Sequence, residues 1–131
     1  MPDGARAAKM PCMAKRPSIQ FPQALHPKDS IRLIAPASPY DKRRMRAGQA
    51  LLEGLGFRLL FDEGRMLSKA GRSYLAHDDE TRAALLKEAL AEKDSQAVWA
   101  VRGGYGTARL LERLNFATRK APPKWLIGFS D

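Results

Sequence analysis

The chain has 131 residues, 44% of them hydrophobic, which suits one globular domain and excludes wholesale disorder. Its net charge of +9 raises the question of nucleic-acid binding, but the basic residues are scattered and no aromatic residues interleave with them as a stacking platform requires. No apolar run reaches the length of about 18 residues that a membrane span needs, and Cys12, the only cysteine, excludes an intrachain disulfide and a thiolate metal cluster.

The N-terminal stretch is rich in proline, alanine and basic residues but has no continuous apolar segment. A secretory signal peptide is therefore not expected, and the cysteine usage fits a cytoplasmic location. We expect residues 1–27 to form a flexible basic leader and residues 28–131 to form an α/β domain.

The first predicted strand is the apolar run at residues 31–35, and a proline-rich connection follows it. Asp41 is a good N-cap for a helix that ends at a pair of glycines, and residues 57–61 are the second strand. The inward stripe expected for this helix is Met45, Ala47, Ala50, Leu51, Leu52 and Leu55.

Residues 62–77 are expected to form a loop, because they are rich in glycine and charge. Asp78 or Asp79 caps the next helix, since a carboxylate suits the positive N-terminal end of a helix. Residues 96–101 have few charges, as a strand buried on both faces should have. The inward stripe expected for the second helix is Ala83, Leu85, Leu86, Ala89 and Leu90.

A glycine turn at residues 102–106 precedes a third predicted helix at residues 107–114, and residues 125–129 are the fourth strand. Ala108, Leu110, Leu111 and Leu114 are expected to face inward. The order β-α-β-α-β-α-β predicts right-handed crossovers and a parallel sheet, hence the α/β class.

Function in open parallel sheets lies at the carboxyl ends of the strands. Three segments are expected to meet there: residues 36–39, residues 102–106, and residues 130–131.

The glycine turn contains Gly103, Gly104 and Gly106, which allow positive φ and close backbone approach to a ligand. Successive N–H groups at a helix start can form an anion or oxyanion site, although such a turn can also need glycine for its geometry alone. Arg109 stands where a dinucleotide fingerprint needs its third glycine, and no Gly-Lys-Ser/Thr follows.

Ser130 follows the last predicted strand and precedes Asp131, which is the place of a nucleophile elbow. The alternative is that Ser130 only caps a helix. A serine nucleophile needs a positioned base, but His26 and His77 are both expected on the surface at the amino ends of the strands. The base is therefore expected outside this sequence, and no His, Asp or Glu pair has convincing metal spacing.

Four blocks of the sequence, in this order, resemble the LD-carboxypeptidases, also called muramoyltetrapeptide carboxypeptidases. They read IRLIAPASP (31–39), YLAHDDETR (74–82), AVWAVRGGYG (97–106) and PKWLIGFSD (123–131). His77 stands for the usual glycine of the second block and Phe129 for the usual tyrosine of the fourth.

The resemblance implies a flavodoxin-like N-terminal domain of a serine peptidase with a Ser-Glu-His triad. Such enzymes remove the terminal D-alanine of murein tetrapeptides during cytoplasmic cell-wall recycling, and related members cleave microcin-type peptide–nucleotide conjugates. By position Ser130 is the nucleophile, and the N–H of Asp131 with one from Gly103 or Gly104 forms the oxyanion hole. Arg102 and Tyr105 are the candidate substrate-binding residues.

The resemblance places the Glu and the His of the triad in a C-terminal domain outside these 131 residues. The sheet is then incomplete at its C-terminal side, and this stretch alone is expected to be inactive. The expected partner is a small peptide, with no metal, organic cofactor, nucleic acid or membrane, and a homodimer of the intact enzyme is left open. The rival hypothesis is a non-catalytic flavodoxin-like module that binds an anion or a nucleic acid, which steep salt dependence would reveal.

Overall fold

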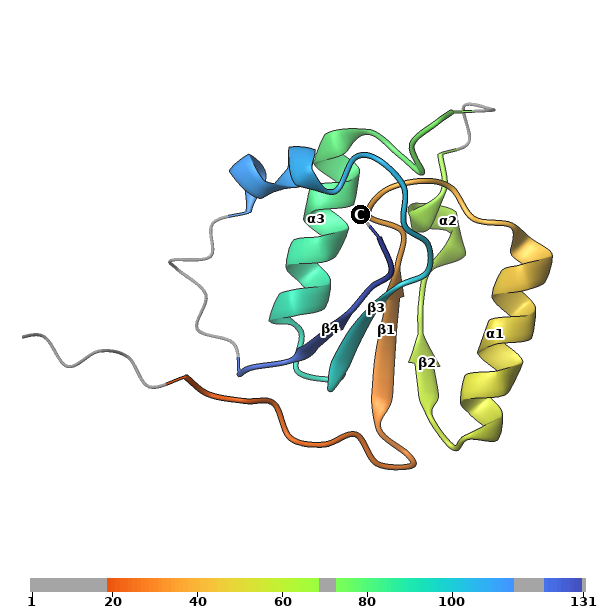
Figure 1. Ribbon diagram of the computed structural model, residues 1–131, viewed down its shortest axis with the longest axis vertical. Coiled ribbons are helices and arrows are strands. Elements are labelled where there is room, and N and C mark those ends of the chain that lie inside the picture. The colour runs from red at the N-terminus through yellow and green to blue at the C-terminus, as the bar shows by residue number, and fades with distance from the viewer. Residues whose placement is uncertain (1–18, 69–72, 115–121, 131) are drawn as a thin grey trace, which may run out of the picture.

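A four-stranded parallel sheet organises the computed structural model, which describes residues 19–68, 73–114 and 122–130 (Figure 1). Its spatial order is β2-β1-β3-β4, so the chain reverses direction across the sheet between β1 and β3. This order is that of flavodoxin-like sheets and confirms the predicted class. The strands are β1 (Ser30–Ile34), β2 (Arg58–Leu60), β3 (Ala97–Ala100) and β4 (Trp125–Ile127).

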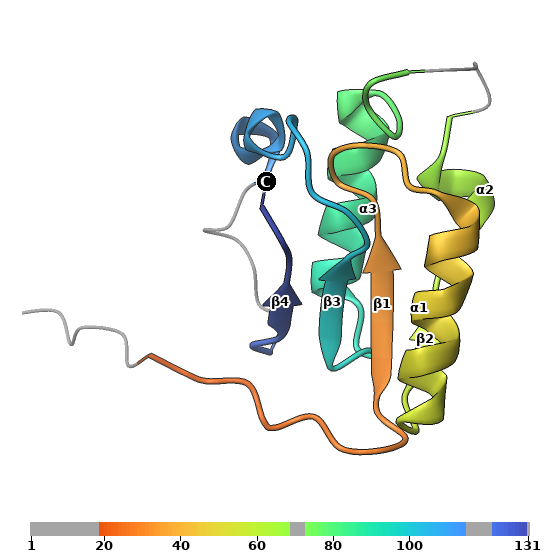
Figure 2. The same ribbon diagram turned by 45° about the vertical axis from the view of Figure 1, so that its right-hand side comes forward.

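Helices cover the two faces of the sheet, with α1 (Lys42–Gly54) on one face and α3 (Asp79–Ala91) on the other (Figures 1 and 2). The main core lies between α3 and the sheet, where the predicted stripe is buried apart from the half-buried Leu85. This core consists of Ile34, Ala83, Leu86, Ala89, Leu90, Val98, Leu110 and Leu114.

Helix α1 corrects one expectation, because none of its residues is buried. Asp41 caps it as predicted, accepting a bond from the Arg44 N–H at 2.8 Å. However, Leu51 is 65% exposed and Leu55 is 59% exposed. Periodicity shows that a helix carries an apolar stripe, but within the described residues only Met45 and Leu52 of this stripe are half-buried.

The segment after β3 is also shorter and tighter than predicted. It forms a 3₁₀ helix, η1 (Ala108–Arg113), in which Leu110 is buried while Leu111 is 56% exposed, and its C-cap Leu114 is also buried. Ala108, expected to face inward, is exposed. Two buried leucines four residues apart offer too little apolar surface to pack a long helix against the domain. The segment is instead a short connector, a common role of 3₁₀ turns. A further short helix, α2 (Glu63–Met66), interrupts the loop expected at residues 62–77.

A polar network fastens the amino ends of the strands. The Lys124 ammonium donates to the Ser95 hydroxyl at 3.0 Å, and that hydroxyl donates to Glu92 at 2.6 Å. Arg32 of β1 completes the network with two hydrogen bonds from Nε and one from Nη2 to the Glu92 carboxylate. Because Glu92 caps the end of α3, this network ties the helix to the strands beneath it.

Part of the expected leader contacts the domain. Leu25 packs against the core on the α1 face, and the indole of Trp125 donates to the Gln23 carbonyl at 2.7 Å. Ile19 and Phe21 are exposed, and residues 1–18 lie outside the described part. Within the described ranges, no helix has the length and apolar character to cross a lipid bilayer.

The α3 N-cap is Asp78, whose carboxylate accepts from the Thr81 N–H at 2.7 Å and the Thr81 hydroxyl at 2.9 Å and lies 2.5 Å from His77 Nδ1. The Thr81 backbone bond is the main cause that lowers the pKa of Asp78 from 3.8 to about 2. A group with a depressed folded pKa stabilises the fold above its unfolded pKa, and this contribution is lost as the pH falls through the folded pKa.

We therefore predict that Asp78→Ala lowers the free energy of unfolding by about 1 kcal/mol at neutral pH, as lost N-caps do. The difference from wild type should shrink between pH 3.8 and pH 2, where wild type loses the same carboxylate. Urea denaturation of both proteins across this range measures it. A difference that stayed constant down to pH 2 would contradict the assigned pKa.

Candidate active site at the carboxyl edge

All four strands end at one edge, called here the carboxyl edge, and the glycine turn lies there between two other segments. On one side it meets the end of β4: a Cβ on Gly103 would lie 2.9 Å from the Ser130 Cβ and would collide with the Phe129 carbonyl oxygen. Gly103 is buried, so this approach leaves no room for any side chain. The sequence therefore brings the turn and Ser130 together, as expected.

On its other side the turn meets the loop after β1. A Cβ on Gly104 would lie 2.9 Å from the Ser38 Cβ and would collide with the Ser38 hydroxyl. The φ of Gly104 is +125°, a backbone conformation that glycine adopts without strain. Ser38 is only 6% exposed, and the sequence patterns did not single it out as a site residue.

Ser130 has a φ of +64°, which for a residue with a Cβ is a strained left-handed conformation. A strained turn directly after a parallel strand is typical of a nucleophile elbow, in which the hydroxyl stands above the sheet. Ser130 is exposed, so its hydroxyl is open to a substrate. Asp131, the other expected oxyanion donor, lies outside the described residues.

The two candidate substrate-binding residues, Arg102 and Tyr105, are both exposed on the turn. The Arg102 guanidinium donates to the Pro39 carbonyl at 2.8 Å, which ties the turn to the loop after β1. Arg102 also borders a pocket of about 440 Å³ between α1 and the sheet. Tyr40, Asp41 and Arg44 line the same pocket, so its polar wall carries charges of both signs.

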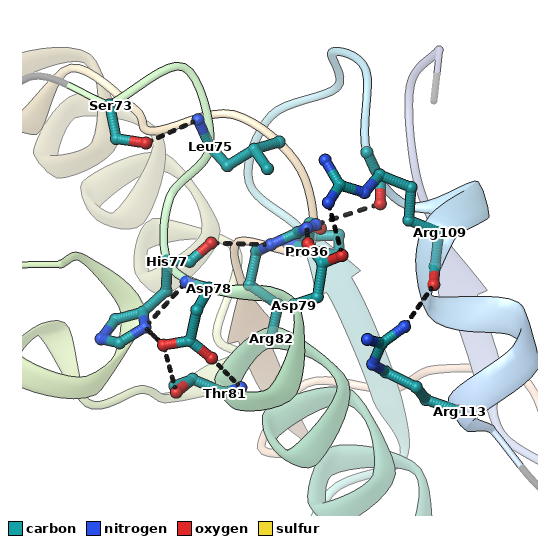
Figure 3. Close-up of polar contacts among 11 residues, drawn as sticks. Pro36, Ser73, Leu75, His77, Asp78, Asp79, Thr81, Arg82, Arg109 and Arg113 are labelled. Carbon is teal, nitrogen blue, oxygen red and sulfur yellow. Dashed lines mark hydrogen bonds and ion pairs between the residues drawn. The ribbon is translucent and has the colours of Figure 1, made fainter.

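A buried arginine that the sequence patterns missed lies behind the turn (Figure 3). Arg82 of α3 is 1% exposed and forms an ion pair with Asp79, which also contacts Arg109 at 2.8 Å. Burial raises the pKa of Asp79, but the hydrogen bonds and charges of these two arginines outweigh it and hold the pKa below its usual value. Helical spacing in the sequence could have indicated that Arg82 is buried, because it stands four residues before Leu86 on the buried stripe.

The structure corrects the expected place of His77, which lies at the carboxyl edge. The Ala76 N–H donates to the Ala37 carbonyl at 2.9 Å, next to the loop after β1. A helix that returns between parallel strands runs antiparallel to them, so the residues before it lie where the strands end. Figure 3 shows the His77 ring beside Asp78, on the side of Arg82 away from Arg109.

His26 lies just before β1, at the amino end as expected, with its backbone N–H bonded to Asp29 at 2.8 Å. The described residues bring no three His, Cys, Asp or Glu side chains together in a way that could hold a metal ion.

A comparison with known protein families identifies the family to which this chain belongs. Residues 31–131 match the model of the LD-carboxypeptidase N-terminal domain. The chain belongs to this family. The match includes β1, the glycine turn and Ser130, which are the segments that meet at the carboxyl edge.

Individual relatives agree with the family. The chain is 39% identical over 123 residues to the murein tetrapeptide carboxypeptidase of Pseudomonas aeruginosa, covering 91% of this chain and 38% of that protein. It is 36% identical over 110 residues to the probable murein peptide carboxypeptidase of Bacillus subtilis, covering 84% of this chain and 34% of that protein. The chain therefore spans about a third of the length of the curated relatives it matches.

A solved structure has the same fold. The microcin C7 self-immunity protein, in complex with adenosine monophosphate, aligns with a TM-score of 0.73 at 25% identity. The alignment covers 87% of this chain and 33% of that one. The four-stranded sheet and its helices are thus a fold that this chain shares with a solved structure.

The contact between Gly103 and the end of β4 gives a prediction that does not depend on activity. Gly103→Ala should lower the free energy of unfolding by about 1–3 kcal/mol, as overpacking does, because its Cβ meets Phe129 and Ser130. Gly48→Ala is the matched control: it has open space around it in α1 and should raise stability by about 0.5–1 kcal/mol. Urea denaturation of the three proteins tests this, and equal effects of both substitutions would exclude the close contact.

Proposed function

We propose that this chain supplies the nucleophile and an oxyanion donor of a serine LD-carboxypeptidase that removes the terminal D-alanine of murein tetrapeptides. The observation that carries the proposal is the contact of strained Ser130 with the buried backbone of Gly103 at the carboxyl edge. Membership of the family and the names of two relatives support it.

The chemistry follows from these groups. The Ser130 Oγ attacks the carbonyl carbon before the terminal residue, and its proton passes to a base. The N–H of Gly103 or Gly104, together with that of Asp131, stabilises the negative oxygen of the tetrahedral intermediate. The same base then gives the proton to the leaving amine, D-alanine departs, and water hydrolyses the acyl-enzyme.

The base and the carboxylate that orients it are proposed to come from a second domain of the family, beyond residues 28–131. We do not assign the base to His77, because its Nδ1 is already in contact with the Asp78 carboxylate at 2.5 Å and with the Asp78 backbone N–H at 2.9 Å. A site shared by two domains also explains why the serine side chain is exposed here.

Arg102 and Tyr105 are proposed to bind the substrate. Both are exposed on the turn that holds the proposed oxyanion donors, and Arg102 borders the pocket beside α1. A guanidinium there suits the terminal carboxylate that a carboxypeptidase must recognise. We favour a murein tetrapeptide over a microcin-like conjugate because the murein-named relatives are 36% and 39% identical, and the microcin immunity protein is 25% identical. Murein recycling would place the protein in the cytoplasm.

Ser130→Ala tests the nucleophile. In the protein produced from the complete gene, it should lower D-alanine release from a murein tetrapeptide by several orders of magnitude, because a catalytic triad acts as a unit. Ser73→Ala is a matched control, since Ser73 is exposed and, among the described residues, its hydroxyl accepts from the Leu75 N–H at 3.2 Å. A Ser130→Ala protein that keeps more than about a tenth of wild-type turnover would remove Ser130 from this role.

The 131 residues by themselves should release no D-alanine and should not be labelled at Ser130 by a fluorophosphonate. A serine hydroxyl is a weak nucleophile near neutral pH without a positioned base. The assays are made on the purified chain, with His77→Gln in parallel. Turnover that disappears in His77→Gln would make His77 the base and would contradict the proposed second domain.

A further inference from the structure

The buried guanidinium of Arg82 is the most unusual polar group among the described residues. Its side chain is 0% exposed, and it lies on the face of α3 that packs on the sheet. Burying a charge costs several kcal/mol unless it is paired and its donors are all used. A leucine at the same position would be buried without this cost in free energy. Core packing therefore does not explain why an arginine stands there.

Those contacts join three separate segments of the carboxyl edge. Nε donates to the His77 carbonyl at 3.0 Å, before α3. Nη1 donates to the Pro36 carbonyl, after β1, and to the Gly106 carbonyl at 3.1 Å, at the end of the glycine turn. Nη2 pairs with Asp79, which neutralises the charge. One planar group thus holds three backbone carbonyls in fixed directions, as the guanidinium geometry allows.

The last glycine of the turn is seated directly on this group. A Cβ on Gly106 would lie 3.2 Å from the Arg82 Nη1 and 2.6 Å from the Leu75 Cδ2. Gly106 has a φ of +134° and Gly104 a φ of +125°. Glycines in such conformations rotate easily, so the direction of the N–H groups in the turn depends on what holds its ends.

Both ends of the turn are held by an arginine. Arg102 fixes the first residue through the Pro39 carbonyl, but Arg102 is exposed and its bond is open to water. Arg82 fixes the last residue from a dry site, and Asp79 extends the hold to Arg109 of η1 at 2.8 Å. The buried contact is therefore the one that sets the orientation of the turn.

We propose that Arg82 is a positioning residue, which aims the N–H groups of the glycine turn at the oxyanion formed on the carbonyl that Ser130 attacks. This inference rests on the proposed function. Arg82 touches neither the substrate nor Ser130. It acts through the Gly106 and Pro36 carbonyls, which flank the turn and the Ser38 loop on which the turn packs.

Arg82→Lys separates positioning from charge. Lysine keeps the positive charge beside Asp79, but a single ammonium lacks the planar fork that reaches three carbonyls. In the protein produced from the complete gene, kcat for D-alanine release should fall about 100-fold, the cost of a small misplacement of a catalytic group. KM should stay within about threefold of wild type, because the turn acts on the transition state more than on the bound peptide.

Arg65→Met is the matched control. Arg65 also binds α3, through two hydrogen bonds of 2.9 Å to Glu88, but its side chain is 50% exposed and these bonds do not involve the turn. It should leave kcat and KM unchanged. Circular dichroism and thermal denaturation of both variants establish which of them are folded under the assay conditions.

The outcomes are distinct. A folded Arg82→Lys protein whose kcat stays within about threefold of wild type overturns the proposal. If Arg82→Lys unfolds, it is assayed at low temperature with sucrose, which favours the folded state. Failure to fold there too assigns Arg82 to folding alone, and also overturns the proposal.

A second readout separates this inference from the proposed substrate. Fluorophosphonate labelling of Ser130 needs the same oxyanion donors but no peptide, so it should slow in Arg82→Lys by a factor similar to the fall in kcat. If the wild-type protein is labelled but releases no D-alanine, the substrate assignment fails and the labelling rates still decide the role of Arg82. If labelling is equally fast in Arg82→Lys and in wild type, the positioning role is excluded.

Discussion

Close backbone contact at the carboxyl edge is the constraint on which the rest of the site depends. The glycine turn lies so near to Ser130 on one side and to Ser38 on the other that no Cβ fits at Gly103 or Gly104. Such contact leaves no room for side chains between the segments, and it sets Ser130 against the backbone of Gly103. The topology makes this contact available, because the chain reverses direction across the sheet between β1 and β3.

Packing alone would leave the turn free to rotate about its glycines, so electrostatics completes the site. Arg82 binds the turn from behind, and its charge is balanced by Asp79 within the same cluster (Figure 3). The strain at Ser130 is of the order of 1–3 kcal/mol and must be offset by the surrounding contacts. A rigid support of this kind is what lets a strained residue persist at the surface of a small domain.

The sequence predicted the four strands and the meeting of the glycine turn with Ser130, because strand order and glycine chemistry follow from local pattern. It failed where the answer depended on distant partners. The apolar stripe of α1 could be seen in the sequence. Whether Leu51 and Leu55 are buried depends on other segments, however, and not on the helix itself. The burial of Arg82 was not predicted because a charged residue usually indicates an exposed face. The place of His77 was predicted wrongly because a helix between two parallel strands runs antiparallel to them, so the residue before it lies at the carboxyl ends of the strands.

The two edges of the sheet are stabilised by separate sets of interactions. At the amino edge, a network of Lys124, Ser95, Glu92 and Arg32 ties α3 to the strands, and Lys124 also donates to the Ala89 carbonyl of α3 at 2.9 Å. Neither the glycine turn nor Ser130 takes part in the hydrogen bonds of this network. Substitutions in this network would therefore change the free energy of unfolding and leave the contact between the glycine turn and Ser130 in place. The domain can thus adapt to a hotter or saltier habitat through its amino edge while the backbone geometry of its carboxyl edge stays constant.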